Sequence, residues 1–386
     1  MKLALLMGNR FNPWHLQGFK RLRGNPEVTA FRAESQIQDH FKRRGDGTEG
    51  FKLERIYFDT QAGNVFTRLA NVFAERYRNR TPRIVPFHDR LHDYDIIHSW
   101  ELFTDWSREA VIARKRFRIP LVVTVWDLLP FNMERTAELR DIKQRVARGA
   151  DRFVVYTDRS REMLGFEGIP KESISVIHPG VDIDAFQPGA ATRQFGLRPD
   201  DFVILFVGWF VPRKGIDFLL YAVRKLIDDG GANASRLKLL IVGSGYGRER
   251  VNALIARLDV QDRCTIVGPL TYNQMPDVFR ASDVFVLPSI ATDEWQEQFG
   301  MSLIEAMACG VPSVASLSGA IPEVAEDAAL LCQPNDFHAL HRALRRIIDS
   351  QELRSELAAK ARRRAVSQFN LQTHAEALSD LYESIL

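Results

Sequence analysis

One stretch, residues 293–323, constrains the fold of this 386-residue chain more than any other part of it. It reads DEWQEQFGMSLIEAMACGVPSVASLSGAIPE. Apolar residues at helical spacing predict a helix over residues 302–308, and Cys309-Gly310 is a typical helix end. Residues 313–315 then predict a short inner strand of a parallel sheet. A loop, a helix, a tight turn and a buried strand in this order are typical of an open α/β sheet.

The same stretch predicts an anion site between two carboxylates. The backbone amides of Gly300, Met301 and Ser302 lie at the start of the predicted helix, where a phosphate group is bound well. Glu297 lies just before that end, and Glu305 lies about one turn further into the helix. A nucleotide-linked sugar needs such a site, because its phosphates need N–H donors and its ribose and sugar hydroxyls need acceptors. Two glutamates at this separation are common by chance, so the prediction depends on the whole context, E-x-F-G-x-x-x-x-E followed by AMACGVP.

Segments with strand character alternate with helical segments along the whole chain. This alternation occurs twice over and predicts an α/β protein with two doubly wound parallel sheets. We expect an N-terminal domain over residues 1–185 and a linker over residues 186–200, which contain several prolines and glycines. The second domain is expected to span residues 201–368.

Bulk composition narrows the class of protein. With 45% hydrophobic residues, the chain has enough apolar material for two domains. The net charge is +3, but Lys and Arg outnumber Asp and Glu by 31 to 25 up to Ala190, against 21 to 24 thereafter. Three cysteines without metal-ligand spacing favour a reducing, cytoplasmic compartment. The apolar start is too short for a signal peptide, and no apolar run approaches the ~20 residues that span a membrane.

Polar residues follow two predicted strands of the first half. Gly8, Asn9 and Arg10 come after the strand over residues 2–7, and His98 falls at the carboxyl end of the strand predicted over residues 94–98. Loops at the carboxyl ends of strands carry ligands in open α/β sheets. These residues are therefore candidates to contact an acceptor or a diphosphate. For Gly8 to Arg10, a plain surface turn is an equally good interpretation.

Two basic clusters stand out in the first half. One is Arg114-Lys115-Arg116-Phe117-Arg118 at the end of a predicted helix, and the other comprises Arg76, Arg78, Arg80 and Arg83. Cations at a helix C-terminus are favoured by the helix dipole, which explains the first cluster without any function. The alternative is a basic, partly apolar patch that rests on anionic lipid headgroups. Nucleic-acid binding is disfavoured, because no aromatic-basic interleaving or known binding module accompanies the clusters.

Seven motifs in the same order as in a known family cover residues 120–323. They are TVWDLLP, SVIHPGVDIDAF, FVGWFVPRKGID, LLIVGSGYG, IVGPL, ASDVFVLPS and the stretch from Glu297 to Glu323. With them the chain resembles the retaining glycosyltransferases of family 4. The resemblance implies the GT-B fold: two Rossmann-like domains with parallel sheets that face each other across a cleft. It also implies that residues 369–386 form a last helix that crosses back to the N-terminal, acceptor-binding domain.

The resemblance implies a role for each matching residue. Arg213 and Lys214 would bind the donor diphosphate and stabilise the charge of the leaving group. Glu297 would face the donor sugar and Glu305 would bind the ribose, and Asp127 is a catalytic candidate through an acceptor contact. The donor site implied by the motifs comprises Gly208, Arg213, Lys214, Pro269, Leu270, Glu297, Phe299, Gly300, Met301, Ser302 and Glu305. No metal and no other cofactor is expected.

Three positions depart from the family pattern. Trp209 stands where many relatives have Arg, Trp126 stands where many have His, and Gly319-Ala320 replaces a common Gly-Gly. Trp126 would then stack on a sugar face of the acceptor. The loss of polar groups at these positions is the reason to keep a non-catalytic alternative open.

The function implied is transfer of a hexose from a UDP- or GDP-sugar, with retention at the anomeric carbon and without a metal. The acceptor would be a glycan or a lipid-linked molecule of the cell envelope, and the basic first half would bring the cytoplasmic enzyme to the inner face of the membrane. Two alternatives stay open: a GT-B sugar-nucleotide epimerase and a non-catalytic nucleotide-sugar-binding protein. The sequence leaves the sugar, the base, the acceptor and the oligomeric state undefined.

Overall fold

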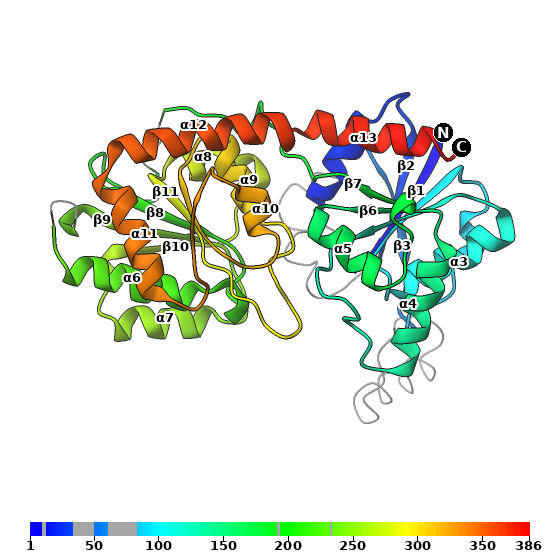
Figure 1. The fold of residues 1–386 in the computed structure, drawn as a ribbon, viewed down its shortest axis with the longest axis horizontal. Coiled ribbons are helices and arrows are strands. Elements are labelled where there is room, and N and C mark those ends of the chain that lie inside the picture. The colour runs from blue at the N-terminus through cyan, green and yellow to red at the C-terminus, as the bar shows by residue number, and fades with distance from the viewer. Residues whose placement is uncertain (10–12, 34–49, 61–82, 191–193, 232–233) are drawn as a thin grey trace. The chain divides into compact units, whose positions relative to one another are not determined.

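The computed structural model describes residues 1–9, 13–33, 50–60, 83–190, 194–231 and 234–386. The chain divides into two compact units, residues 1–177 with 374–386 and residues 178–373 (Figure 1). Residues 178–185 thus belong to the second unit, whereas the sequence assigned them to the first. The reason is a parallel bridge between Val181 and Asn370, in which Val181 N–H donates to Phe369 O at 2.8 Å and Leu371 N–H to Val181 O at 3.0 Å.

The first unit is built on a parallel sheet. Within the described residues it has seven strands in the order β3-β2-β1-β4-β5-β6-β7. The central strands are buried on both faces, and their near-continuous apolar sequences follow from this burial. Its elements are β1 (Lys2–Gly8), η1 (Pro13–Arg21), β2 (Glu27–Ala33), β3 (Lys52–Ile56), η3 (His88–Leu91), β4 (Ile96–Trp100), α3 (Asp105–Phe117), β5 (Leu121–Val125), α4 (Ala137–Gly149), β6 (Arg152–Val155), α5 (Asp158–Phe166), η4 (Lys171–Ser173), β7 (Ile174–Val176) and, from His374 on, α13 (Leu371–Glu383).

The second unit repeats this architecture with a parallel sheet in the order β10-β9-β8-β11-β12-β13. Its strands are β8 (Phe202–Val207), β9 (Leu237–Val242), β10 (Cys264–Val267), β11 (Val284–Leu287), β12 (Ser313–Ser316) and β13 (Leu330–Cys332). Its helices are η5 (Pro212–Lys214), α6 (Ile216–Asp228), η6 (Ala234–Arg236), α7 (Arg248–Arg257), η7 (Gln261–Arg263), η8 (Tyr272–Gln274), α8 (Met275–Arg280), α9 (Met301–Ala308), α10 (Ile321–Ala325), α11 (Phe337–Asp349) and α12 (Gln351–Gln368). The two doubly wound parallel sheets predicted from the sequence are therefore confirmed.

After β12 the chain forms two short elements that the sequence patterns do not predict, α10 (five residues) and β13 (three residues). Elements this short carry too few residues for a helical or alternating pattern to be visible. They form because β13 pairs with β12 and α10 buries Ile321, Val324 and Ala325.

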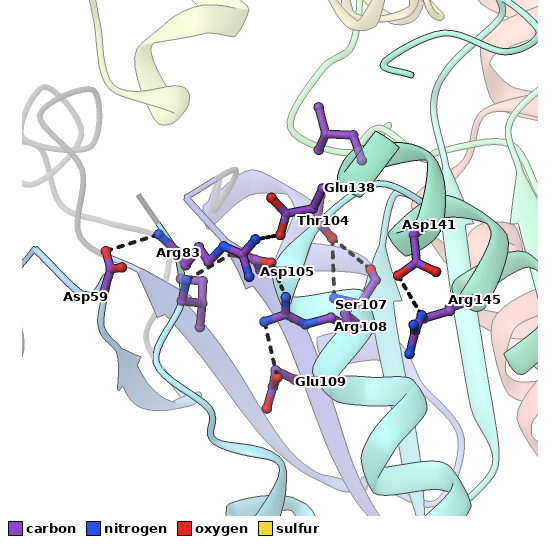
Figure 2. Close-up of polar contacts among 12 residues, drawn as sticks. Asp59, Arg83, Thr104, Asp105, Ser107, Arg108, Glu109, Glu138, Asp141 and Arg145 are labelled. Carbon is purple, nitrogen blue, oxygen red and sulfur yellow. Dashed lines mark hydrogen bonds and ion pairs between the residues drawn. The ribbon is translucent and has the colours of Figure 1, made fainter. Parts of the chain in front are cut away.

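The N-terminus of α3 anchors the segment that precedes β4 (Figure 2). Thr104 caps the helix by accepting the Ser107 N–H at 3.3 Å, and Asp105 accepts the Ile84 N–H at 3.1 Å. Arg83 is ion-paired with Glu138 at the start of α4. Of the cluster Arg76, Arg78, Arg80 and Arg83, only Arg83 lies within the described residues. It forms its ion pair with a residue of the same unit.

The helix α13 is attached to the first sheet through a buried histidine. Strand β4 ends at Trp100, two residues later than predicted, so His98 lies inside the strand, 1% exposed, and not at the carboxyl end. Its Nδ1 is hydrogen-bonded to the Tyr382 hydroxyl, and its Nε2 lies 2.6 Å from Thr124 Oγ1. Burial lowers the pKa of His98 to about 3, so the ring stays neutral. The predicted acceptor contact of His98 is therefore wrong, because both ring nitrogens are engaged in the core.

Removing one hydroxyl should loosen this attachment. In a Tyr382→Phe variant, one nitrogen of the buried His98 ring loses its partner, which costs about 1–3 kcal/mol. We expect the opening free energy of β4 and β5 amides, measured by native-state hydrogen exchange, to fall by that amount. Tyr246→Phe is the control, because that side chain is 82% exposed. Equal protection of these amides in both variants would contradict the structural role of the contact.

Candidate functional site

The residues predicted to bind the donor gather at one edge of the second sheet. All the strands of this sheet run parallel, so their carboxyl ends meet at the same edge. The loops after β8, β9, β10, β11 and β12 leave from that edge. They contain Gly208 to Lys214, Gly243 to Gly247, Pro269-Leu270, Pro288 to Gly300 and Leu317 to Ala320.

The loop after β8 is pressed against the loop after β11. Gly215 has φ +68°, and a Cβ placed on it would lie 1.8 Å from Pro288 O. Only glycine fits this approach, because both the backbone conformation and the space exclude a side chain. The Ile290 N–H also donates to Arg213 O at 2.9 Å. These contacts hold the backbone of Arg213 and Lys214 beside the carboxyl end of β11.

Lys214 and Glu297 form a mostly buried ion pair at this junction. Lys214 Nζ donates to Glu297 Oε2 at 2.6 Å, and the Ser289 hydroxyl donates to the same oxygen at 2.5 Å. The side chains of Lys214 and Glu297 are only 18% and 8% exposed. The structure therefore brings together the cation and the carboxylate to which the family pattern gives phosphate and sugar contacts. Ser289 is the last residue of the ASDVFVLPS motif, but its contact with Glu297 was not predicted, because that contact exists only in the folded chain.

The backbone of Glu297 is anchored by the turn after β12. Ala320 N–H donates to Glu297 O at 2.9 Å. Gly319 has φ +55°, and a Cβ on it would lie 2.2 Å from the same carbonyl oxygen. The first glycine of the family's Gly-Gly pair is thus required here by close approach. The sequence pattern by itself showed only that Ala320 replaces the second glycine of this pair.

The helix α9 begins with the predicted turn. Gly300 caps it in the left-handed region at φ +88°, and the amides of Met301 and Ser302 belong to its first turn, whose N–H groups have no partner within a helix. The Phe299 side chain is 1% exposed and lies edge-on to Phe369, with ring centroids 5.6 Å apart. Phe299 is therefore a core residue, and the prediction that it contacts the donor is wrong for its side chain.

Glu305 projects from the second turn of α9 into a poorly solvated environment. Burial raises its pKa from 4.5 to about 8. Tyr272 lies close enough to interact with Glu305. The pKa of this tyrosine is raised well above its usual value, first by burial and then by the charge of Glu305. A carboxyl group in such a setting forms strong hydrogen bonds with hydroxyl groups that replace water. The predicted ribose position is thus polar inside an apolar surrounding.

The remaining predicted donor residues lie at the same edge. Gly208 packs against the next loop so closely that a Cβ on Gly243 would lie 1.9 Å from Gly208 O. Pro269 and Leu270 follow β10 and are half-buried. Trp209 follows Gly208 in the loop after β8 and is 40% exposed.

In the first unit, an aromatic cluster occupies the carboxyl edge of the sheet. The Trp126 ring lies 4.8 Å from that of His15 and 4.7 Å from that of Tyr156. Gly8 and Asn9 follow β1 at the same edge, and Arg10 lies outside the described residues. Gly8, Asn9 and Trp126 are thus near the ends of strands where ligands bind.

Asp127 has a role within its own loop. Its Oδ1 accepts the N–H groups of Leu128 at 2.8 Å and Leu129 at 3.1 Å, and its Oδ2 accepts from Asn132 Nδ2 at 2.8 Å. These bonds use most of the lone pairs of the carboxylate and shape the loop after β5. A contact between Asp127 and an acceptor stays a prediction.

Metal sites and membrane-spanning helices are both absent from the described part of the chain. No group of three or more His, Cys, Asp or Glu side chains there is arranged to hold a metal ion. None of the helices described is both long and apolar enough to cross a lipid bilayer.

Two family profiles match the two halves of the chain. The profile described as "Glycosyltransferase Family 4" matches residues 44–185, and the one described as "Glycosyl transferases group 1" matches residues 190–364.

Curated relatives agree with these profiles. A D-inositol 3-phosphate glycosyltransferase of Mycobacteroides abscessus is 34% identical over 251 residues, which cover 61% of this chain and 53% of the relative. One of Streptomyces griseus is 31% identical over 327 residues, covering 76% of this chain and 67% of the relative. The chain thus spans between about half and two thirds of the length of these relatives.

Solved structures share the fold at low sequence identity. HepE of Anabaena, solved in complex with UDP, has a TM-score of 0.77 at 20% identity, with 100% of both chains covered. Sucrose-phosphate synthase of Thermosynechococcus elongatus has a TM-score of 0.77 at 23% identity, covering 100% of this chain and 99% of that one.

The raised pKa of Glu305 makes the stability of the second unit depend on pH. The folded-state pKa of about 8 lies above the ordinary value of 4.5, so the unfolded chain loses this proton first as the pH rises. We expect the free energy of unfolding to fall between about pH 4.5 and pH 8 by up to a few kcal/mol. Glu305→Gln should abolish this part of the fall, as urea unfolding at pH 5 and pH 8.5 can measure. Parallel pH profiles of the two proteins would refute the assignment.

Proposed function

We propose that this chain, which belongs to glycosyltransferase family 4 and has the GT-B fold, transfers a hexose from a UDP- or GDP-sugar to an acceptor with retention of anomeric configuration. The observation that carries the proposal is the Lys214–Glu297 pair at 2.6 Å, next to Arg213 and the N-terminus of α9. Cations, amides and a carboxylate at one sheet edge match the phosphates and the hydroxyls of such a donor.

The cations act on the leaving group. Cleavage of the anomeric bond leaves negative charge on a phosphate oxygen, and preorganised positive groups stabilise that charge more strongly in the transition state than in the substrate. Arg213 and Lys214 supply the cations, and the amides of Gly300, Met301 and Ser302 supply the N–H donors. We infer that these groups do the work of a metal, so that a chelator leaves the activity unchanged.

Glu297 is assigned to the sugar and not to nucleophilic attack. Its Oε2 already accepts hydrogen bonds from Lys214 and Ser289, which occupy the lone pairs that a nucleophile would use. Its Oε1 is the atom left to accept from a donor hydroxyl. We therefore favour a front-face path in which the leaving phosphate oxygen takes the proton of the acceptor hydroxyl as that hydroxyl attacks the anomeric carbon.

The acceptor is proposed to be a glycan or a lipid-linked molecule. The aromatic cluster around Trp126 supports a sugar-containing acceptor, since aromatic faces pack well against the apolar faces of sugar rings. The relatives carry the name of D-inositol 3-phosphate glycosyltransferase, so that compound belongs in the first set of acceptors.

The first test is binding and slow hydrolysis over a panel of UDP- and GDP-sugars, followed by turnover with the acceptor panel. Titration calorimetry and product chromatography give the two readouts. We expect one donor to bind and to be hydrolysed slowly with its sugar released in the retained configuration. Absence of binding to every donor would overturn the proposal, and binding without turnover over all acceptors would favour the non-catalytic alternative.

Lys214→Ala and Glu297→Gln should both remove most of the activity. Each takes away a group proposed to act in the transition state, so kcat should fall about 100-fold or more. Arg257→Ala is the matched control, because this exposed cation lies at the end of α7 in the same unit. Thermal unfolding must accompany the assay, since either change leaves its former partner in the ion pair without a counter-charge. Normal turnover of both folded variants would remove their assigned roles.

The basic end of α3 is proposed to contact the membrane from the cytoplasmic side. A pocket of about 570 Å³ there is lined by Arg114, Lys115, Arg118 and Arg152 together with the apolar Ile119, Pro120 and Ile385. Arg114 is neutralised by its ion pair with Asp151, whereas Lys115 and Arg118 are exposed. Exposed cations beside apolar side chains suit anionic lipid headgroups.

Vesicle flotation tests this contact. Each basic residue near an anionic membrane contributes about 1 kcal/mol, so Lys115→Glu with Arg118→Glu should weaken binding to phosphatidylglycerol vesicles about 30-fold or more. Arg257→Glu with Arg346→Glu changes the net charge equally on the second unit and serves as control. The contact is refuted by equal flotation of the two double variants.

A further inference from the structure

Trp295 lies against both cations of the donor site. The Arg213 guanidinium carbon is 4.7 Å from the centroid of the indole ring, and Lys214 Nζ is 4.9 Å from it. Cations within about 6 Å of an aromatic centroid are attracted by the quadrupole of the ring. One side chain from the loop after β11 therefore holds two charges from the loop after β8. The family motifs quoted above do not include this residue.

The two cations need such a partner because they are neighbours in the chain and repel each other. Lys214 has Glu297 as its counter-ion at 2.6 Å. For Arg213, no carboxylate of the described residues lies within ion-pair distance, and the side chain is exposed. Without the ring, its long side chain would sample many rotamers, and ordering it on ligand binding would cost free energy.

The position of the ring is fixed by the backbone on both sides. Thr292 N–H donates to Trp295 O at 2.8 Å and Trp295 N–H to Thr292 O at 3.3 Å, which closes a tight turn. Two residues further on, Glu297 O accepts from Ala320 N–H at 2.9 Å. The indole is half-buried and is held between these two anchors.

We propose that Trp295 is a positioning residue for the donor diphosphate, which it serves by holding Arg213 and Lys214 in place through cation–π contacts. The inference rests on the proposed function, because it takes the ligand of these cations to be the diphosphate of a nucleotide sugar. It adds a determinant of donor affinity that touches the cations and not the base. Loss of the ring should therefore weaken the binding of the phosphates and leave the recognition of the nucleoside unchanged.

The test compares two variants that differ in the aromatic face. Trp295→Phe keeps a π face, whereas Trp295→Leu keeps an apolar side chain without one. Calorimetry with UDP, GDP, UMP and GMP gives the affinities. For the nucleoside diphosphate that the unmodified chain binds, we expect about tenfold weaker binding to the Leu variant and less than about threefold to the Phe variant. The corresponding monophosphate should show a smaller loss, because it carries one phosphate fewer.

Controls separate positioning from plain packing. Phe166→Leu, at a side chain of the first unit that is 72% exposed, should bind as the unmodified chain does. Thermal unfolding shows whether each variant is folded. If the Leu variant is not folded, Trp295→Gln replaces it in the comparison. Rescue by Phe over Leu is a result that a packing role would not produce.

Each remaining outcome decides the matter. Equal losses in the Leu and Phe variants would overturn the inference by showing a packing role only. Unchanged or tighter diphosphate binding to the Leu variant would also overturn it, the latter by showing that the ring obstructs the ligand. In both cases the proposed function stands, because the unmodified chain binds the nucleotide. If the unmodified chain binds neither UDP nor GDP, the proposed function fails and this inference fails with it.

Discussion

The ion pair between Lys214 and Glu297 is the contact on which the rest of the donor edge depends. Its side chains come from loops after the neighbouring strands β8 and β11, and a nearly buried carboxylate is costly unless a cation faces it. The pair can form only because Gly215 lets one loop approach Pro288 and Gly319 lets a third loop approach Glu297. The two glycines thus set the geometry of the site, and Lys214 and Glu297 supply its charged groups.

The parallel order of the strands then decides which residues meet. In each unit the carboxyl ends of the strands lie at one edge, so loops far apart in the chain become neighbours there. The second unit collects cations, amides and carboxylates at this edge, and the first collects the rings of His15, Trp126 and Tyr156. The two edges therefore differ in chemistry although the two sheets are built alike.

Sequence patterns predicted the elements of the second unit closely and misjudged particular side chains. The runs FVILFV, LKLLIV and CTIV over residues 202–207, 237–242 and 264–267 coincide with β8, β9 and β10, because strands of a parallel sheet are mostly apolar and each run ends at a glycine. His98 and Phe299 were expected to face ligands, but both are buried, His98 because β4 ends two residues later than its pattern suggested. A small shift in a strand changes which residue ends it, and no local pattern fixes that shift.

The sequence by itself determined the fold class, the two-sheet plan, the family and most residues of the donor edge, because periodicity, helix stops and motif order are local properties of the chain. Only the tertiary structure decided which of those residues touch. Lys214 and Glu297 are 83 positions apart, and the Trp295 contact with both cations depends on two loops that meet through sheet pairing. Side-chain contacts over such separations arise from tertiary packing, so they cannot be predicted from a local sequence pattern.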